Sequence, residues 1–258
     1  MNSRMMRRQM KKIAAVAAIL LIPVFSLAQE TPLPFLQMVD LPVAGTLPKG
    51  SYVSSIRLYP HGGVLGALSI GLSDRFYFGV SFGGENIIGE GDIHWNPEPG
   101  LHLAYRILDE NMLLPAVSIG YNSQGYGPYI KETKRYTIKS RGFYAVASKN
   151  YAFLGDLSFH GGVNFSLEKG DGDSDADLFV GLLKSLNPDL TVLAEYDFAL
   201  NDNDVRSLGS GKGYLNVGVR WLFARRLAIQ FHVKNILQNK HNVPHANREI
   251  KILYLEHF

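Results

Sequence analysis

Five ionisable side chains in the last quarter of the chain have types and spacings that could act together electrostatically. Glu195 and Asp197 lie two residues apart, as do His232 and Lys234, and Arg220 falls between the two pairs. Residues two apart on a β-strand share one face of the sheet. Acids and cations on neighbouring strands can neutralise one another or line a pore and set its ion selectivity. We expect a structural network here, and a pore lining remains the alternative.

Alternating aspartates suggest a second kind of chemistry, the binding of Ca²⁺. Acids occupy every second position of residues 171–177. The EF-hand loop needs a glycine at its sixth position and a glutamate at its twelfth, where this chain has Ala176 and Leu182. We therefore expect a solvated acidic loop tip, with bridging of divalent cations to lipopolysaccharide as the functional alternative, and no metal site is assigned.

A basic cluster lies in the longest stretch without strand character. Its members are Lys131, Lys134, Arg135 and Lys139. Such a cluster could bind lipid A phosphates or an acidic polysaccharide through charge-assisted hydrogen bonds. A hydrated loop face is the simpler interpretation.

Ser158 and His160 could form a nucleophile and base pair, since both lie on one face of a predicted strand. That face is expected to point into a barrel lumen, whereas lipid substrates would approach from outside. The pair is therefore interpreted as polar lumen contacts, and the sequence predicts no catalytic residue and no cofactor. Cysteine is absent, which excludes disulfides and Cys-based metal or redox sites.

The elements that must position these residues are strands, because apolar residues recur with period two. Phe76, Phe78, Val80 and Phe82 alternate with small or polar residues. The same alternation recurs from residue 50 to the end, over about twelve segments each near the ~10 residues of a tilted membrane strand. The chain is predicted to be all-β, an antiparallel transmembrane β-barrel of about twelve strands.

The polar faces distinguish a barrel from a soluble sandwich, which remains the alternative. They combine charges with many glycines, as in a crowded hydrated lumen, while the opposite faces are aliphatic and aromatic. Aromatics near strand ends are expected to form girdles at the two membrane interfaces: Tyr52, Tyr59, Tyr121, Tyr214, Trp221, Phe223 and Tyr254.

The predicted connections alternate between short and long, which indicates short periplasmic turns and longer outside loops. The tight turns are expected at 72–75, 108–111, 149–153, 187–189 and 224–226. The longer loops are expected at 84–99, 122–140, 168–176, 201–212 and 237–247, and one outside connection, 60–63, is short.

The first residues predict export. Residues 1–28 combine five cations, no acid and an apolar run, as a signal peptide does, with cleavage expected near Ala28. Cleavage changes the formal charge from +3 to −2, so no basic nucleic-acid footprint remains. We expect a proline-rich, extended lead-in on the periplasmic side over 29–49, a barrel over 50–258, and a location in the outer membrane of a Gram-negative bacterium.

The last strand carries an assembly signal. Ile250, Ile252 and Tyr254 share a face, and the chain ends on Phe258. A terminal aromatic on such a strand is typical of what the barrel-assembly machinery recognises, although Glu256 stands where a hydrophobic residue is usual. The expected partners are this machinery, outer-membrane lipid, lipopolysaccharide and surface polysaccharide.

Residues 41–50, 142–151 and 160–164 resemble an uncharacterised group of bacterial outer-membrane proteins similar to YjbH-type barrels. The resemblance implies a barrel associated with exopolysaccharide production and transfers no residue role. A small passive pore or export-associated barrel is the leading functional interpretation. An outer-membrane enzyme acting on lipid and a structural or adhesive surface protein are the alternatives.

Overall fold

The computed structural model describes residues 33–240 and 246–258, so the signal peptide predicted for 1–28 lies outside the described residues. Within these ranges the chain forms fifteen strands. No helix in this part of the chain has the length and apolar character needed to cross a membrane. In chain order the strands are β1 (Ser51–Tyr59), β2 (Gly63–Ser73), β3 (Phe76–Glu85), β4 (His94–Trp95), β5 (Gly100–Leu108), β6 (Ala116–Asn122), β7 (Tyr126–Ile130), β8 (Arg135–Ile138), β9 (Gly142–Ala152), β10 (Asp156–Phe165), β11 (Asp177–Ser185), β12 (Leu190–Asp197), β13 (Tyr214–Phe223), β14 (Leu227–Lys234) and β15 (Asn247–His257).

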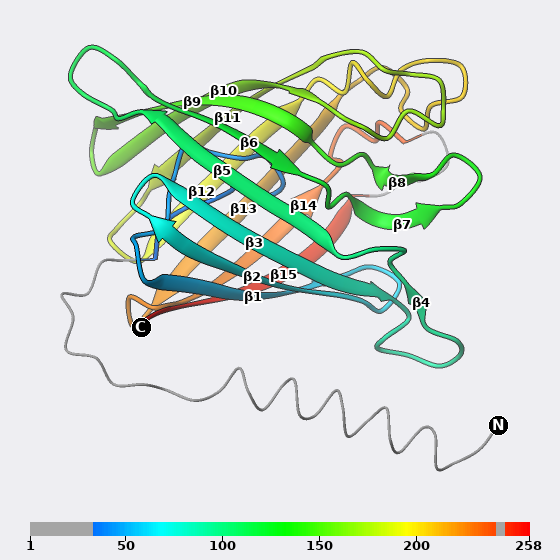
Figure 1. The fold of residues 1–258 in the computed structure, drawn as a ribbon, viewed down its shortest axis with the longest axis horizontal. Coiled ribbons are helices and arrows are strands. Elements are labelled where there is room, and N and C mark those ends of the chain that lie inside the picture. Colours follow the sequence, from blue (N-terminus) through cyan, green and yellow to red (C-terminus); the bar gives the residue numbers. More distant parts are fainter. Residues whose placement is uncertain (1–32, 241–245) are drawn as a thin grey trace.

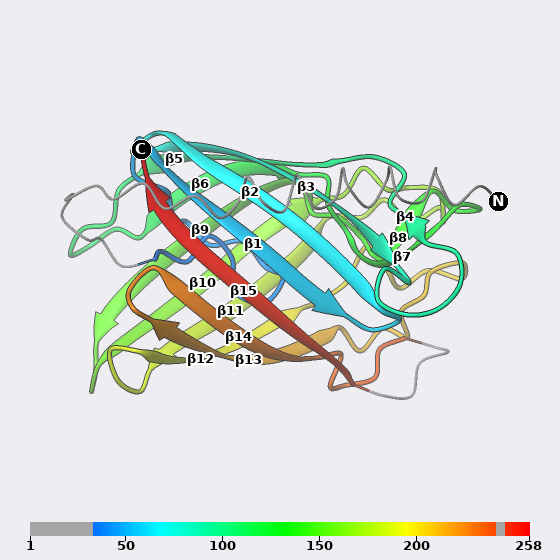
Figure 2. The same cartoon turned by 90° about the horizontal axis from the view of Figure 1, so that it is seen from below.

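Twelve of the described strands close into one antiparallel barrel. Each of them pairs with its neighbour along the chain, once β4, β7 and β8 are set aside, and β1 also pairs with β15. The register of this seam runs from Ser51 opposite His257 to Leu58 opposite Ile250, and Figure 2 shows β15 lying beside β1. A closed barrel has no free edge. The predicted twelve-stranded antiparallel barrel is confirmed.

The two faces of the strands differ as the period-two pattern predicts. On β13, Val219, Trp221 and Phe223 are 37%, 49% and 55% exposed, whereas Asn216 and Arg220 are buried. Apolar side chains therefore point outward and polar ones inward, the reverse of a soluble β-sandwich.

The girdle prediction is wrong at two tyrosines. Tyr214 is buried inside the barrel, where its hydroxyl donates to Asp202 at 2.7 Å, and the Tyr59 hydroxyl donates to the carbonyl oxygen of Gly84 at 2.8 Å. Both residues fall on the inward-facing register positions of their strands. There each hydroxyl has a hydrogen-bond acceptor, which stabilises the buried tyrosine.

The connections are short at one end of the barrel and long at the other, here called the short-turn end and the long-loop end (Figure 1). The turn expected at 108–111 is longer, because β5 ends at Leu108 and β6 begins only at Ala116. The Asn111 side chain accepts the N–H groups of Leu113 and Leu114, both at 2.9 Å, which forms a local turn in place of strand pairing. At the long-loop end, β7 and β8 form a separate hairpin within the longest loop.

Residues 33–47, here called the lumenal segment, lie inside the barrel, as the blue trace in Figure 1 shows. The segment begins at the short-turn end, where the Leu33 N–H donates to the carbonyl of Arg225 at 3.1 Å, turns at 37–42, and returns to the same end, where it joins β1. This differs from the extended lead-in expected over 29–49. Its prolines remove backbone donors that a strand needs, and nothing in the sequence pattern indicates that its apolar residues are buried in the lumen.

Two apolar clusters join the lumenal segment to the wall. Met38, Leu41 and Val43 pack with Phe179 and Leu193 among others in one cluster. A second cluster, at the short-turn end, combines residues of the segment with residues of the wall: Leu33, Leu47, Val53, Tyr77, Ala104, Ala228, Leu253 and Leu255. Burying each large aliphatic side chain stabilises this arrangement by roughly 1.5 to 3 kcal/mol. The lumenal segment and the inner face of the barrel wall therefore form an apolar core inside the barrel.

Candidate functional site in the barrel lumen

The turn of the lumenal segment is bound by a single wall carboxylate. Gln37 and Pro42 form an isolated bridge that brings three consecutive N–H groups together at the tip. The Glu195 carboxylate on β12 accepts from the N–H groups of Val39, Asp40 and Leu41, each at 3.0 Å. Asn216 on β13 donates to the same carboxylate at 2.7 Å. Glu195 therefore satisfies backbone donors that would otherwise be buried without partners.

The side chain of the same turn is bound by cations. The Asp40 carboxylate lies 2.6 Å from Arg57 Nη1 on β1 and 2.6 Å from Lys234 Nζ on β14. Both cations also contact Glu249 on β15, at 3.2 and 3.0 Å. Two acids and two cations, all buried, thus form a neutral cluster that connects the segment to three strands. Buried charges are tolerated when they are paired and hydrogen-bonded in this way.

Three wall arginines bind carbonyl groups of the segment. Arg57 Nη2 donates to Val39 at 2.6 Å, Arg106 donates twice to Ala44 at 2.9 and 2.7 Å, and Arg220 donates to Leu33 at 2.5 Å. The segment has almost no strand partners, so these side chains supply the hydrogen bonds that its backbone requires. Its attachment consists of side-chain contacts rather than a β-ladder.

Tyr126, at the start of the β7–β8 hairpin, extends into the lumen above this cluster. Its ring centroid lies 4.3 Å from the Arg57 guanidinium carbon and 4.8 Å from Lys234 Nζ. Cations over an aromatic face are attracted by its quadrupole. The hairpin in the longest loop and the lumenal segment therefore meet at the same two cations.

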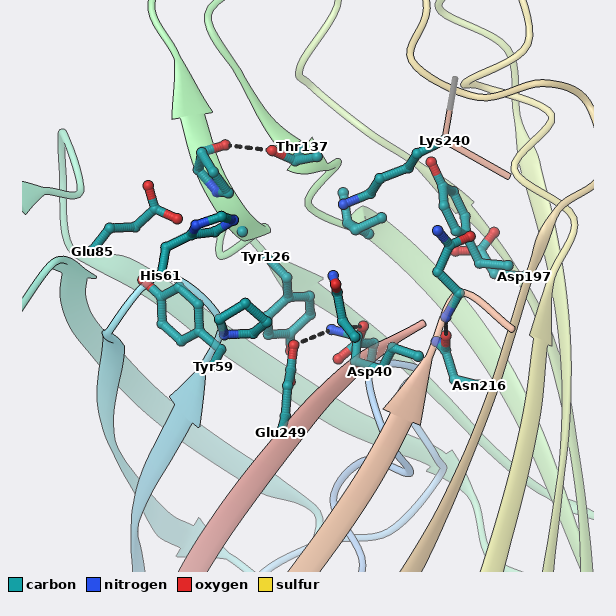
Figure 3. A pocket seen from close by; sticks show the side chains of 18 of the residues that line it. Asp40, Tyr59, His61, Glu85, Tyr126, Thr137, Asp197, Asn216, Lys240 and Glu249 are labelled. Carbon is teal, nitrogen blue, oxygen red and sulfur yellow. Dashed lines mark hydrogen bonds and ion pairs between the residues drawn. The ribbon is translucent and has the colours of Figure 1, made fainter. Parts of the chain in front are cut away.

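Two cavities lie in the lumen on either side of this contact. The cavity toward the long-loop end, here called the outer cavity, has a volume of about 170 Å³. Figure 3 shows Lys240 and Glu85 on opposite sides of it, with Tyr126 between them. Burial, together with the charge of Lys234, lowers the pKa of Lys240 to about 8. A second cavity of about 60 Å³, here called the inner cavity, lies between the segment and the wall strands that include β1, β13 and β15.

All five residues predicted for the lumen network are buried inside the barrel, each 5% exposed or less. They do not form one network. Asp197 pairs with Arg141 at 2.5 Å, Lys234 pairs with Asp40 and Glu249, and His232 lies 3.1 Å from Gln230. Glu195 binds N–H groups and Arg220 binds a carbonyl, so neither has an ion-pair partner in the described residues.

Sequence reasoning missed Asp40, Arg57, Tyr126, Arg141 and Glu249. Period two contains a signal for two of them, because Arg57 alternates with outward Ile56 and Glu249 precedes outward Ile250. No local pattern identifies the other three, since they reach the lumen from segments without barrel pairing.

Part of each charged loop cluster binds the other. The solvated acidic tip and the hydrated basic face expected from the sequence are therefore wrong for Asp171, Arg135 and Lys139, whereas Lys131, Lys134 and Asp175 are exposed. Arg135 contacts Asp171 and lies 2.6 Å from Asp202, and Lys139 lies 2.9 Å from Asp171. All four side chains are buried. In residues 33–240 and 246–258, no group of three or more His, Asp or Glu side chains could hold a metal ion. The charges instead join three long loops across the mouth of the barrel.

Glu168 lies beside this ion cluster. Burial raises the pKa of Glu168 to about 7, although the backbone N–H groups of Ser140 and Tyr136 act in the opposite direction. The Ser140 N–H donates to its carboxylate at 2.9 Å. This carboxyl is therefore the loop group whose charge changes nearest to neutral pH among those with a shifted pKa.

Ser158 and His160 do not contact each other. His160 Nδ1 lies 2.8 Å from the Ser148 hydroxyl, which also accepts the Ala44 N–H at 2.8 Å, while Ser158 donates to Asn150. No acid in the described residues hydrogen-bonds to His160. The arrangement holds the lumenal segment and contains no Ser–His–acid relay.

The chain matches no protein-family model and no curated protein sequence. Among solved structures, it is similar to the KdgM porin, with a TM-score of 0.52 at 10% identity over 79% of this chain and 98% of that one. An outer-membrane channel from Pseudomonas putida F1 has a TM-score of 0.44 at 12% identity, covering 83% of this chain and 98% of the other. The NanC porin has a TM-score of 0.41 at 11% identity, with 81% and 98% covered. The likeness to the KdgM porin is one of fold, that of an outer-membrane β-barrel, and none of the comparisons points to the YjbH-type group in particular. The chain has the fold of an outer-membrane porin.

Proposed function

We propose that the protein is a channel in the outer membrane of a Gram-negative bacterium, and that the lumenal segment closes it. The outward belt of exposed aliphatic and aromatic side chains supports insertion into lipid, because so large an apolar face is unfavourable in water. The polar inner face supports passage of small polar solutes.

The observation that carries the proposal is the position of the tip of the segment. Residues 37–42 lie between the inner and outer cavities, and they are attached through Glu195, Asp40 and wall arginines rather than through strand pairing. Side-chain contacts can break while the barrel ladder stays intact. Movement of the tip would join the two cavities, which makes the channel gated rather than permanently open.

Conductance across planar bilayers tests the proposal. In the double variant Asp40→Asn, Glu195→Gln, the tip loses its two ion pairs with Arg57 and Lys234 and a charged acceptor, so we expect openings at least tenfold more frequent than in the native protein. The matched control is Asp175→Asn, Glu98→Gln, which changes the same residue types at exposed loop positions. Equal opening frequencies in both double variants would contradict gating by the segment.

A disulfide between the segment and the wall provides a reversible test of the same idea. The sequence has no native cysteine, and the Ala44 N–H donates to the Ser148 hydroxyl at 2.8 Å, so cysteines introduced at these two positions connect neighbouring points of the segment and the wall. Oxidation should abolish the openings of the double variant, and reduction should restore them.

Two broader parts of the proposal have their own tests. Fractionation with outer membranes, and gel migration that changes on heating, test the location. The association with exopolysaccharide production rests on the resemblance of residues 41–50, 142–151 and 160–164, and polysaccharide secretion by a strain lacking the protein tests it.

A further inference from the structure

A row of polar side chains with three cations crosses the wall at one level of the lumen. Arg57 on β1 is opposite Lys251 on β15, Lys251 is opposite Gln230 on β14, and Gln230 is opposite Arg220 on β13. Directly opposed residues on neighbouring antiparallel strands have Cβ atoms about 4.5 to 5.5 Å apart. The barrel register therefore brings three cations and one amide to a common patch.

This row lines the inner cavity, and none of the described residues that line this cavity is an acid. The remaining polar lining consists of hydroxyl, amide and imidazole groups, which can donate hydrogen bonds. The volume of about 60 Å³ exceeds several-fold the roughly 10 to 15 Å³ that one water needs. The cavity has room for a small polyatomic ion.

The three cations of the row differ in the partners that they have. Arg57 has Asp40 and Glu249 as partners, and Arg220 has the Leu33 carbonyl and the Phe35 ring, 4.0 Å from the guanidinium carbon. Lys251 is only 6% exposed, and within the described residues its ammonium has no hydrogen bond or ion pair. A buried ammonium without a counter-charge is strongly unfavourable.

The groups facing Lys251 do not supply this counter-charge. Arg57 and Arg220 repel it, and the nearby carboxylates of Asp40 and Glu249 are already bound to Arg57 and Lys234. Lys251 and Arg220 therefore both lack a carboxylate partner, and the patch carries more cations than acids.

We propose that the inner cavity is a binding site for a small oxyanion, of the size of inorganic phosphate or acetate. Lys251 provides its main counter-charge, with Arg220 and Gln230 as flanking hydrogen-bond donors. Several donors that converge from different strands suit an ion with several acceptor oxygens. Because residues 34–37 of the lumenal segment form the other side of the cavity, the bound anion also ties the segment to the wall. The site does not require the channel to open.

Thermal unfolding of the full-length barrel in phosphate-free detergent micelles tests this site. Phosphate, sulfate or acetate is added at constant ionic strength against chloride. A ligand that binds the native state raises the unfolding midpoint in proportion to its occupancy. We expect a rise of several degrees with at least one oxyanion, and the comparison of tetrahedral ions with acetate identifies which shape the site prefers.

Variants at Lys251 locate the effect. Lys251→Met should weaken oxyanion binding at least tenfold by calorimetry, and it should raise the midpoint in chloride alone because an unpaired buried charge is removed. Lys251→Arg should retain binding, and Lys169→Met, at an exposed loop lysine, should change neither quantity. If Lys251→Met does not fold, Gln230→Leu provides the second test and should weaken binding without removing a charge.

The proposal is overturned if none of the oxyanions raises the midpoint of the native protein, or if they raise that of Lys251→Met equally. A failure of gating in bilayers leaves these binding measurements unaffected, so the two proposals are tested separately.

Discussion

Asp40 Oδ2 lies 2.6 Å from Lys234 Nζ, which places an ion pair between the lumenal segment and a strand almost two hundred residues later in the chain. Lys234 also holds Glu249, so removing Asp40 would leave Arg57 and Lys234 to share one acid. The pair is buried, so its loss should destabilise both the lumenal segment and the wall strands that hold it.

The variant Asp40→Asn should destabilise the barrel, because breaking a buried pair from one side costs roughly 3 to 5 kcal/mol. Equilibrium unfolding in urea from lipid vesicles measures the free energy. Asp175→Asn, at an exposed loop carboxylate, should change it by less than about 0.5 kcal/mol. Equal effects of the two substitutions would show that the cluster adds no stability.

Gly181 on β11 leaves space for a residue of the lumenal segment. A Cβ at this position would lie 2.1 Å from Met38 Cε, the flexible end of that side chain. Gly181→Leu should therefore displace the segment, at a cost of roughly 1 to 3 kcal/mol for overpacking, and should increase channel openings in planar bilayers. Met38→Ala combined with Gly181→Leu should restore the native opening frequency, and failure of this rescue would place the effect elsewhere.

Asp171 connects two cations of the long loops. Lys139 and Arg135 hold the pKa of its carboxyl below the ordinary value despite an opposing effect of burial. Asp171→Asn should remove the ion-pair partner of Lys139 and leave Arg135 with Asp202 alone, which should loosen the loops over the mouth. Hydrogen exchange should then increase at 135–141 and 198–213, with the amides of the twelve barrel strands unchanged. A uniform increase across the barrel would indicate global destabilisation instead.

The elevated pKa of Glu168 predicts a pH dependence of stability. Its native pKa is about 7 and its ordinary value is 4.5, so the native state binds the proton more tightly than the unfolded state does. Stability from this group is present below pH 4.5 and is lost as the pH rises to about 7. Unfolding midpoints measured between pH 4.5 and 8 should fall less in Glu168→Gln than in the native protein. An identical fall in both would assign the dependence to other groups.

The C-terminal residue closes the seam of the barrel. The Phe258 N–H donates to the Gly50 carbonyl at 2.8 Å, and its ring stacks on Tyr52 with centroids 6.4 Å apart. Deleting Phe258 should reduce the heat-modifiable, folded fraction in outer membranes, whereas Phe198→Ala, another exposed aromatic, should reduce it less. Normal insertion of the truncated chain would count against a terminal assembly signal.

The barrel could be predicted because successive side chains on a β-strand point to opposite faces, so the alternation is visible in short stretches of sequence. Alternation alone identifies Val219 as outward and Arg220 as inward, whatever the rest of the chain does. The same rule places Tyr59 and Tyr214 inward, beside Arg57 and Asn216, so their assignment to the aromatic girdles was wrong because it rested on residue type and not on register. The partner of each charge depends on contacts between distant segments, which alternation does not encode. Glu195 binds the backbone of residues 39–41, and Arg135 binds loops that follow it by 36 and 67 residues.

The lumenal segment also implies an order of assembly. It contacts wall residues on β1, β5, β9, β12, β13 and β14, from around the whole circumference, and it is joined directly to the strand that forms the final seam. A finished cylinder would have to accept this folded turn through its short-turn end, against its own side chains. We therefore expect the wall strands to assemble around the segment first and the β1–β15 pairing to form last, so that the lumenal segment acts as an internal template for the barrel.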